Sequence, residues 1–231
     1  CLNYMLDANK YSVSEENYIK AIFHLQEEVE RVNTLQLAQV MKTKPASITD
    51  MLKKLKNKKL LDYQPYYGFK LTNEGNKIAL GVIRRHRIWE YFLAEKLQFN
   101  LHEIHELAEV LEHVSSKKLI DKLDAYLGLP KFDPHGDPIP DLNGKIALEN
   151  HVLLSVMKVK TKGRVCRIAS ASKKIMELIS HQQIKLGSQI MVLQRFEFDD
   201  SMEIMIDGKH KVNISQQLAK NIFINYEAKK R

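Results

Sequence analysis

Cysteine is scarce in this chain, since only Cys1 and Cys166 occur among its 231 residues. Two cysteines supply neither a disulfide scaffold nor a thiolate zinc finger. Long apolar runs are missing too, because no uninterrupted stretch approaches the roughly 20 residues that span a bilayer. The first ten residues also lack the basic start and the apolar stretch of a signal peptide. We therefore expect a cytoplasmic protein with no membrane partner.

The composition is balanced, with a modest excess of positive charge. Hydrophobic residues make up 44% of the chain and charged residues 28%, which is typical of a folded globular protein. Lys and Arg number 36 against 28 Asp and Glu, a net charge of +8 that favours a polyanionic partner such as nucleic acid or an acidic membrane face. With 231 residues the chain exceeds one ordinary domain, so we expect two compact units joined by a linker.

Proline is rare as well, and four of the six prolines fall within the segment 130–140. Each proline removes a backbone donor and biases the preceding residue away from helical angles, so a helix cannot run through this segment. We place a domain boundary at residues 130–150.

Upstream of this boundary, apolar residues recur with the period of a helix. A first helix is predicted over residues 12–28, with Ser14 as the candidate N-cap. A second runs from Thr34, its expected N-cap, to Met41, and a third carries its apolar face on residues 48–55. Two short helices joined by a tight turn are typical of a helix-turn-helix. Aromatic residues around Gly68 then predict a hairpin, which in this place is a wing.

Further helices are predicted at residues 72–97, 101–115 and 117–127. Beyond the boundary the apolar period becomes two, which predicts strands at residues 189–193, 202–206 and 210–214. Asp207-Gly208 marks a tight turn between the last two of these strands. We expect a mainly α region with a winged helix-turn-helix, followed by a small all-β barrel. The predicted division is 1–75 for the winged helix, 76–130 for the following helical domain, 131–150 for a Pro-rich linker and 151–231 for the barrel.

The third helix concentrates positive charge, because residues 41–60 hold seven lysines and one acid, Asp50. Lysine contacts to phosphate supply affinity without sequence preference, and small residues at a helix start let the backbone approach base edges. A solvated amphipathic helix is the alternative, but the coincidence with a helix-turn-helix and wing favours DNA binding. The expected DNA-contacting residues are Lys44, Pro45, Ala46, Ser47, Thr49, Asp50, Lys53, Lys54 and Tyr67.

The helix at 101–115 carries a stripe of metal-ligand side chains. His105, Glu109, Glu112 and His113 fall within an arc of about 100° on one face. His86 and Glu90 form a second pair, one turn apart on the preceding helix. A solvated surface is the alternative, but two matching stripes favour a bound cation. Carboxylates and imidazoles without thiolates suit Mn²⁺ or Fe²⁺ better than structural zinc, and a diiron enzyme would need Glu-x-x-His on two helices.

Several motifs together resemble the diphtheria toxin repressor and manganese transport regulator family. They are Ser14-Glu-Glu-Asn-Tyr-Ile-Lys-Ala-Ile, the helix start Pro45-Ala-Ser-Ile-Thr, Arg85-His86-Arg87 with Glu90, Glu109-x-x-Glu112-His113, and Asp133-Pro-His-Gly-Asp-Pro-Ile-Pro140. The resemblance implies a homodimeric winged-helix repressor that binds operator DNA when loaded with Fe²⁺ or Mn²⁺. It also implies a helical dimerisation domain and an SH3-like, FeoA-like C-terminal barrel, and it implies regulation of metal-uptake genes.

The resemblance also implies two sets of metal ligands. The primary set is Asn17, Glu109, Glu112 and His113, and the ancillary set is His86, Glu90 and His105. Oxygen donors at positions 17 and 109 resemble the manganese branch of the family. This chain departs from that branch at Asn17, where an Asp is usual, and at Lys20, where its short members have Glu. Whether the barrel donates a metal ligand stays open, with Glu177 and His181 as the two candidates.

Two other functions are open. One is a metal-independent winged-helix regulator, in which the His and Glu stripes are only a charged surface. The other is a metal-dependent hydrolase, although the sequence contains no nucleophile motif, phosphate loop or cofactor fingerprint. A regulator, and not an enzyme, is the expectation.

Overall fold

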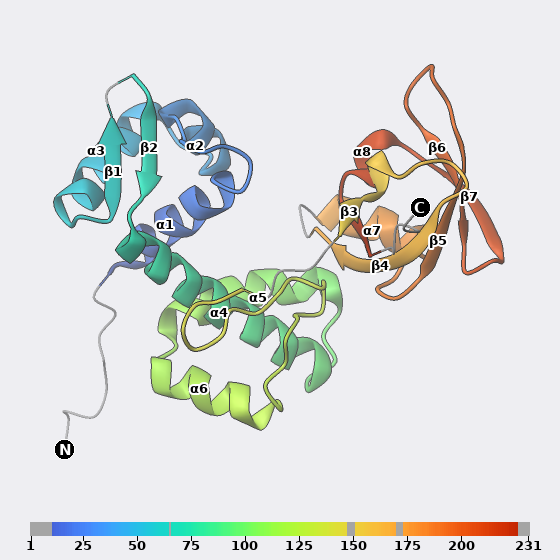
Figure 1. Ribbon diagram of the computed structural model, residues 1–231. Helices are drawn as coiled ribbons and strands as arrows, with labels where there is room; N and C mark the ends of the chain where they lie inside the picture. Colours follow the sequence, from blue (N-terminus) through green and yellow to red (C-terminus); the bar gives the residue numbers. More distant parts are fainter. Residues whose placement is uncertain (1–10, 65, 147–150, 170–172, 226–231) are drawn as a thin grey trace. The chain divides into compact units, whose positions relative to one another are not determined.

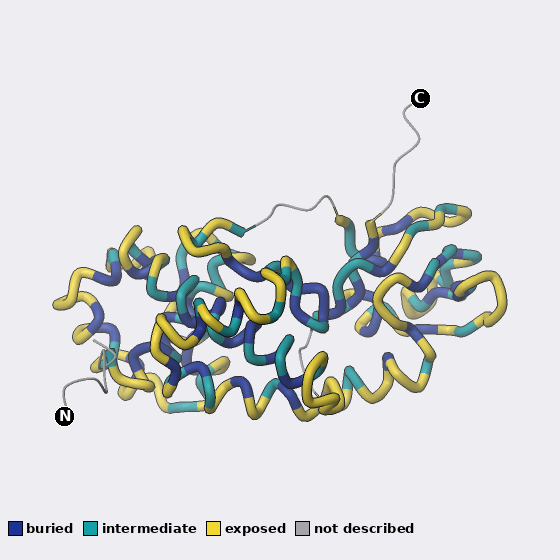
Figure 2. Tube along the Cα trace, turned by 90° about the horizontal axis from the view of Figure 1, so that it is seen from below, coloured by how far each residue is buried: buried dark blue, intermediate teal, exposed yellow. Residues whose placement is uncertain are grey.

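The computed structural model describes residues 11–64, 66–146, 151–169 and 173–225. The chain divides into two compact units, one of Cys1–Trp89, Glu106–Pro130 and Ile139–Ile146, the other of Glu90–His105, Lys131–Pro138 and Ala147–Arg231. Each unit has buried positions of its own, drawn in dark blue in Figure 2. Cys1 and the segment examined for a signal peptide lie outside the described residues. Within them, no helix is long and apolar enough to cross a membrane.

The first unit begins with the predicted winged helix-turn-helix (Figure 1). Its elements are α1 (Val13–Leu25), α2 (Thr34–Val40), α3 (Pro45–Asn57), β1 (Leu61–Gln64) and β2 (Gly68–Leu71). The two strands pair antiparallel, with Leu61 opposite Leu71. Ile19, Ile22 and Ile48 are fully buried in one cluster, so α1 and α3 share a core.

The N-cap residues of α1 and α2 lie one or two residues before the predicted ones. Ser12, and not Ser14, caps α1: its hydroxyl accepts from the Glu15 N–H, and the Glu15 carboxylate accepts from the Ser12 N–H. Asn33 and Gln36 form the same reciprocal box at α2, where Thr34 was expected as the cap. In both cases an acidic or amide side chain three residues later selects the cap.

Three further helices follow the winged helix-turn-helix. They are α4 (Asn73–Glu95), α5 (Leu101–Val114) and α6 (Lys117–Tyr126), which confirms the three predicted helices. In the first unit, Ile88 of α4 packs with Ile120 of α6 and with Ile139. Arg84 also donates to Asp124 at 2.8 Å. These contacts join α6 and the end of the proline-rich segment to α4.

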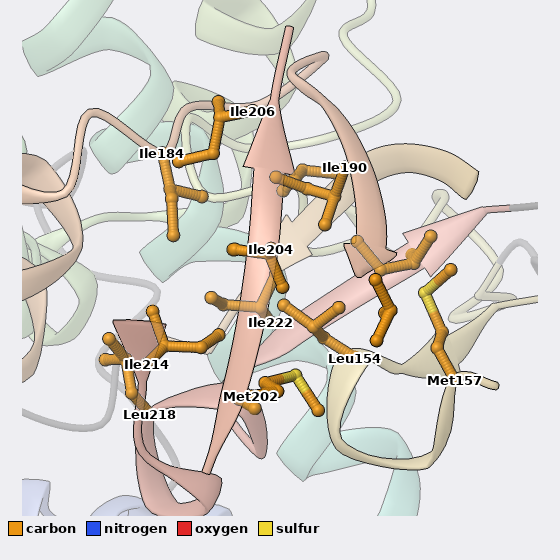
Figure 3. Packing of buried hydrophobic residues seen from close by; sticks show 14 of the residues in the cluster. Leu154, Met157, Ile184, Ile190, Met202, Ile204, Ile206, Ile214, Leu218 and Ile222 are labelled. Atoms are coloured by element: carbon orange, nitrogen blue, oxygen red, sulfur yellow. The ribbon is translucent and has the colours of Figure 1, made fainter. Parts of the chain in front are cut away.

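The second unit contains a six-stranded antiparallel sheet with the strand order β3-β8-β4-β5-β6-β7. Its elements are β3 (Val152–Leu153), η1 (Leu154–Val156), β4 (Lys162–Ile168), α7 (Lys173–His181), β5 (Gln189–Arg195), β6 (Met202–Ile206), β7 (His210–Ile214), α8 (Gln216–Ala219) and β8 (Ile222–Asn225). Figure 3 shows the isoleucines of β5, β6 and β8 gathered around Leu154. The three predicted strands are confirmed as β5, β6 and β7. Asp207 and Gly208 both have positive φ between β6 and β7, as a tight hairpin turn requires.

Candidate functional site

The ring of His113, near the end of α5, contacts the first turns of α1. Its Nδ1 lies 2.6 Å from Glu16 Oε2, and its Nε2 lies 2.8 Å from Asn17 Oδ1. Glu112 Oε1 is 3.1 Å from the same Nε2. Burial acts to lower the pKa of His113, but its hydrogen bonds to Glu112 and Glu16 outweigh this and raise the pKa to about 9. The ring is therefore protonated on both nitrogens and positively charged at neutral pH, so a metal that binds one nitrogen must displace a proton.

Glu112 is fully buried and lies at the centre of a polar cluster formed with Lys20, His86 and His113. Its Oε1 lies 2.6 Å from Lys20 Nζ, and its Oε2 lies 2.6 Å from His86 Nδ1. Burial acts to raise the pKa of Glu112, but the hydrogen bonds from His113 and His86 and the charge of Lys20 hold it far below its ordinary value. A buried, ionised carboxylate therefore connects residues of the two predicted ligand sets.

Lys20 brings a positive charge into the predicted primary site. The Lys20 side chain is 14% exposed, and its Nζ lies 3.7 Å from Glu109 Oε1 and 2.6 Å from Glu112 Oε1. These carboxylates thus already attract a cationic group, so the donor set of Asn17, Glu112 and His113 with Glu109 fits a divalent ion by its chemistry. Such an ion must share Glu112 with Lys20.

The predicted ancillary ligands also come together. His86, Glu90 and His105 offer ligand atoms within 4.8 Å of one another, the only such group of three among the residues that the structure describes. His86 and Glu90 are one turn apart on α4, and the boundary between the two units falls inside that turn. His105 Nδ1 lies 3.2 Å from Glu90 Oε1. Two imidazoles and one carboxylate are a set that fits Mn²⁺ or Fe²⁺.

Glu16 is not among the site residues expected from the sequence, although it belongs to the motif that begins at Ser14. Glu16 is buried, and its second carboxylate oxygen accepts from Arg85 at 2.7 Å. Arg85 also donates from Nε to the Glu112 carbonyl at 2.6 Å. Glu16 therefore links α1 to α4 and α5 beside Asn17. Helical spacing alone does not reveal this, because the partners of Glu16 lie far away in sequence.

The two candidate barrel ligands lie elsewhere in the second unit. Glu177 and His181 are exposed on α7 and line a cavity of about 780 Å³ together with His135, Met176 and Ile184. Neither belongs to the group of potential metal ligands described above.

All nine expected DNA-contacting residues are exposed, on α3 or at its start and in the turn of the hairpin. Lys44 is the N-cap position of α3 and Pro45 its first residue. The Thr49 hydroxyl donates to the Pro45 carbonyl. Tyr67 is 76% exposed in the hairpin turn. This surface therefore offers lysines and small side chains on one helix, as an interface with DNA requires.

Lys54 of α3 and Lys58, which caps the end of α3, both pair with the buried Glu15. Lys58 Nζ lies 2.6 Å and Lys54 Nζ 3.3 Å from Glu15 Oε1. Lys53, in contrast, pairs with Asp50 at 3.6 Å, and both side chains are exposed. We therefore expect Lys53→Ala to reduce the slope of log affinity against log salt by about one, and Lys54→Ala to reduce it less. Fluorescence anisotropy over a salt series measures both slopes. If both variants have the same slope as the wild type, these lysines do not contact phosphate.

Glu15 also makes the winged helix sensitive to acid. Burial acts to raise the pKa of Glu15, but bonds to Lys58, to the Ser12 N–H and to Lys54 lower it from 4.5 to about 2. Because the folded pKa is depressed, this stabilisation is complete above about pH 4.5 and is lost as the pH falls towards 2. We expect Glu15→Gln to lower the unfolding free energy by about 1–2 kcal/mol at pH 7. Thermal melts at pH 7 and pH 3.5 check this. The difference in melting temperature between variant and wild type should be smaller at pH 3.5, and an equal difference at both pH values contradicts the assignment.

Three family models match consecutive parts of the chain. The N-terminal DNA binding domain of iron dependent repressors matches residues 10–69. The metal binding and dimerisation domain of iron dependent repressors matches residues 72–141, and the FeoA domain matches residues 152–226. The matches follow the order of winged helix, helical region and β-sheet that the structure shows.

Named relatives agree with these matches. The chain is 36% identical over 120 residues to the HTH-type transcriptional regulator MntR of Oceanobacillus iheyensis, covering 52% of this chain and 81% of that protein. It is 28% identical over 134 residues to the diphtheria toxin repressor of Corynebacterium glutamicum, covering 58% of each. A solved manganese-dependent transcriptional repressor in complex with manganese is 32% identical, with a TM-score of 0.85 and coverage of 91% of this chain and 98% of that one.

Proposed function

Because this chain belongs to the family of metal-dependent transcriptional repressors that includes MntR and the diphtheria toxin repressor, we propose that Asn17, Glu109, Glu112 and His113 hold the divalent ion that enables operator binding. The observation that carries the proposal is the contact of His113 on α5 with Asn17 on α1, at 2.8 Å. One end of the site thus lies in the winged helix and the other in the helix that follows the wing and α4. The chain is a regulator and not an enzyme, since the family consists of transcriptional regulators. Membership of this family excludes the metal-dependent hydrolase.

Manganese is the preferred ion in this proposal, with Fe²⁺ as the second choice. Bound there, a divalent ion supplies two positive charges and bonds shared by two helices. Asn17 and Glu109 give oxygen donors, and His113 gives a nitrogen. Ions of this hardness favour such a set over thiolates, and a solved relative is described as a complex with manganese. His86, Glu90 and His105 are proposed to hold an ancillary ion of the same kind.

The residues of α1 connect the metal site to the DNA-binding surface. Asn17 lies on the same helix as Ile19 and Ile22, which pack in the cluster that contains Ile48 of α3. A fixed distance between Asn17 and His113 therefore fixes where α3 lies relative to α5. In a homodimer this sets the spacing of two recognition helices near one turn of DNA, about 34 Å. A coupling of about 2.7 kcal/mol would change operator affinity about a hundred-fold.

The wider biological role follows from this mechanism. We propose a homodimer that acts in the cytoplasm, where its operator DNA lies, and that represses genes for metal uptake. We also propose the division into a winged helix at 1–75, a helical metal-binding and dimerisation domain at 76–130, a Pro-rich linker at 131–150 and a barrel at 151–231. The match to the dimerisation domain at residues 72–141 supports the homodimer.

A metal titration distinguishes this function from a metal-independent regulator. Duplexes are first selected from a random pool by the full chain in the presence of Mn²⁺. Anisotropy of the selected duplex is then followed as Mn²⁺, Fe²⁺ or Zn²⁺ is added to protein freed of metal by EDTA. We expect tight binding only with metal, at its strongest with Mn²⁺. Equal affinity with and without metal would favour the metal-independent regulator.

A further inference from the structure

The C-terminal sheet domain carries the whole excess of positive charge. In residues 151–231 Lys and Arg number 15 against seven Asp and Glu, whereas residues 1–150 hold 21 basic and 21 acidic side chains. The lysines of residues 41–60 are therefore balanced by acids elsewhere in the first 150 residues. Because the net charge of +8 lies beyond them, a polyanion bound to this chain is attracted to the sheet domain as well as to α3.

The sheet of this domain has an inner face that is covered by helices. Ile190 of β5 and Ile204 and Ile206 of β6 point into the buried cluster (Figure 3). Ile179 of α7 and Leu218 of α8 belong to the same cluster, so both helices pack on this inner face. Successive side chains of a strand point to opposite faces, so the residues next to these isoleucines point to the outer face. Neither α7 nor α8 covers that outer face.

A row of four residues crosses the outer face from β4 to β7. Lys162 of β4 is opposite Met191 of β5, which is opposite Met205 of β6. Met205 is in turn opposite Lys211 of β7. Both lysines are exposed, and both methionines are half-buried. Neighbouring strands are about 4.8 Å apart, so the Cα atoms of the two lysines are about 14 Å apart, which is about four base pairs along a DNA duplex.

Arg164 and Glu203 are further charged residues on this face. Arg164 follows Lys162 by two residues on β4 and is exposed, whereas Glu203 precedes Met205 by two residues on β6 and is half-buried. Asp207, in the turn after β6, has its carboxylate bonded to a backbone N–H of β5 at 2.7 Å. The two ends of the row are therefore basic, as contact with a phosphate backbone requires.

We propose that the outer face at Lys162, Arg164 and Lys211 is a second DNA-contacting surface, which binds the phosphate backbone beside the sequence that the winged helix reads. A duplex held by the winged helix is present at a high local concentration around the rest of the same chain. An acidic lipid surface fits less well, because proteins that lie on membranes add exposed apolar side chains, whereas half-buried methionines separate these lysines. The inference rests on DNA binding by the winged helix and adds affinity without sequence preference to it.

The test compares two lengths of the duplex selected with Mn²⁺. One is trimmed to the segment that the full chain protects from DNase I, and the other is extended by about 10 base pairs, one helical turn, at each end. We expect Lys162→Gln/Lys211→Gln to bind the extended duplex about tenfold more weakly at low salt and to reduce the slope of log affinity against log salt by about two. Binding to the trimmed duplex should not change. Lys174→Gln/Lys220→Gln removes the same charge from α7 and from the end of α8, and this matched control should bind both duplexes as the wild type does.

Three results would overturn the inference. The first is a wild type that binds the trimmed and extended duplexes equally, and the second is a Lys162→Gln/Lys211→Gln variant with the affinity and salt slope of the control. The third is a variant that keeps both but no longer binds vesicles of phosphatidylglycerol and phosphatidylcholine, which would assign the face to lipid. Metal dependence is measured separately on the trimmed duplex, so failure of the metal-dependent function leaves the comparison of the two variants valid. Melting curves verify that both variants are folded.

Discussion

We expect His113→Ala to lower Mn²⁺-dependent operator affinity about a hundred-fold while the chain stays folded and dimeric. His113 contacts Glu16 and Asn17 on α1 and its own neighbour Glu112. Removal of the ring takes away the nitrogen donor that α5 offers to the first helix of the winged helix. The winged helix then loses the connection that fixes α3 for DNA.

Anisotropy with the selected duplex measures this effect at saturating Mn²⁺ and in EDTA. The variant should bind at the weak, metal-free level under both conditions. His24→Ala is the matched control, because His24 lies near the end of α1 with an exposed side chain that pairs with the nearby Glu27. Metal-dependent binding that survives in His113→Ala would contradict the proposed role of α5.

The second large effect is expected for Lys20→Gln, which should bind Mn²⁺ about tenfold more tightly than the wild type. The ammonium of Lys20 lies 2.6 Å from Glu112 Oε1, so it repels a divalent ion that uses the same carboxylate. A tenfold change corresponds to about 1.4 kcal/mol, which is within the range of one nearby charge partly shielded by solvent. Glutamine keeps a hydrogen-bond donor at this position without the charge.

The same substitution should make the metal-free protein less stable. Glu112 is fully buried and ionised, and without Lys20 it loses one of the positive charges that stabilise its ionised form beside His86 and His113. We expect the unfolding free energy in EDTA to fall by about 1–3 kcal/mol. Dialysis and thermal melts measure the two effects, with Lys117→Gln, a surface lysine paired to Asp121, as the control. Unchanged or weaker Mn²⁺ binding by Lys20→Gln would show that the ammonium does not compete with the ion.

Local sequence signals were sufficient for most of the fold. The helical period from α1 to α6 and the alternation in β5, β6 and β7 each reflect one buried face, which a sequence displays directly. Helix α7 was missed, although Ile175, Met176 and Ile179 repeat at helical spacing. Its nine residues are too few for that period to stand out against the polar residues around them.

The candidate site was only partly predictable, and the reason is physical. His105, Glu109, Glu112 and His113 share one helix, so their spacing alone placed them on one face. Glu16 meets its partner His113 only through a tertiary contact, which no local pattern encodes. The position of Lys20 among carboxylates is also a tertiary result, and the sequence indicated only that this residue departs from a related pattern.

The central claim is that Asn17 on α1 and Glu112 and His113 on α5 share one divalent ion. Anomalous diffraction at the manganese edge, from crystals of the full chain soaked in Mn²⁺, tests this claim most directly. We predict an anomalous peak within about 2.2 Å of Asn17 Oδ1 and of a ring nitrogen of His113. A crystal whose peaks lie only at His86, Glu90 and His105, with Lys20 still against Glu112, would contradict the account.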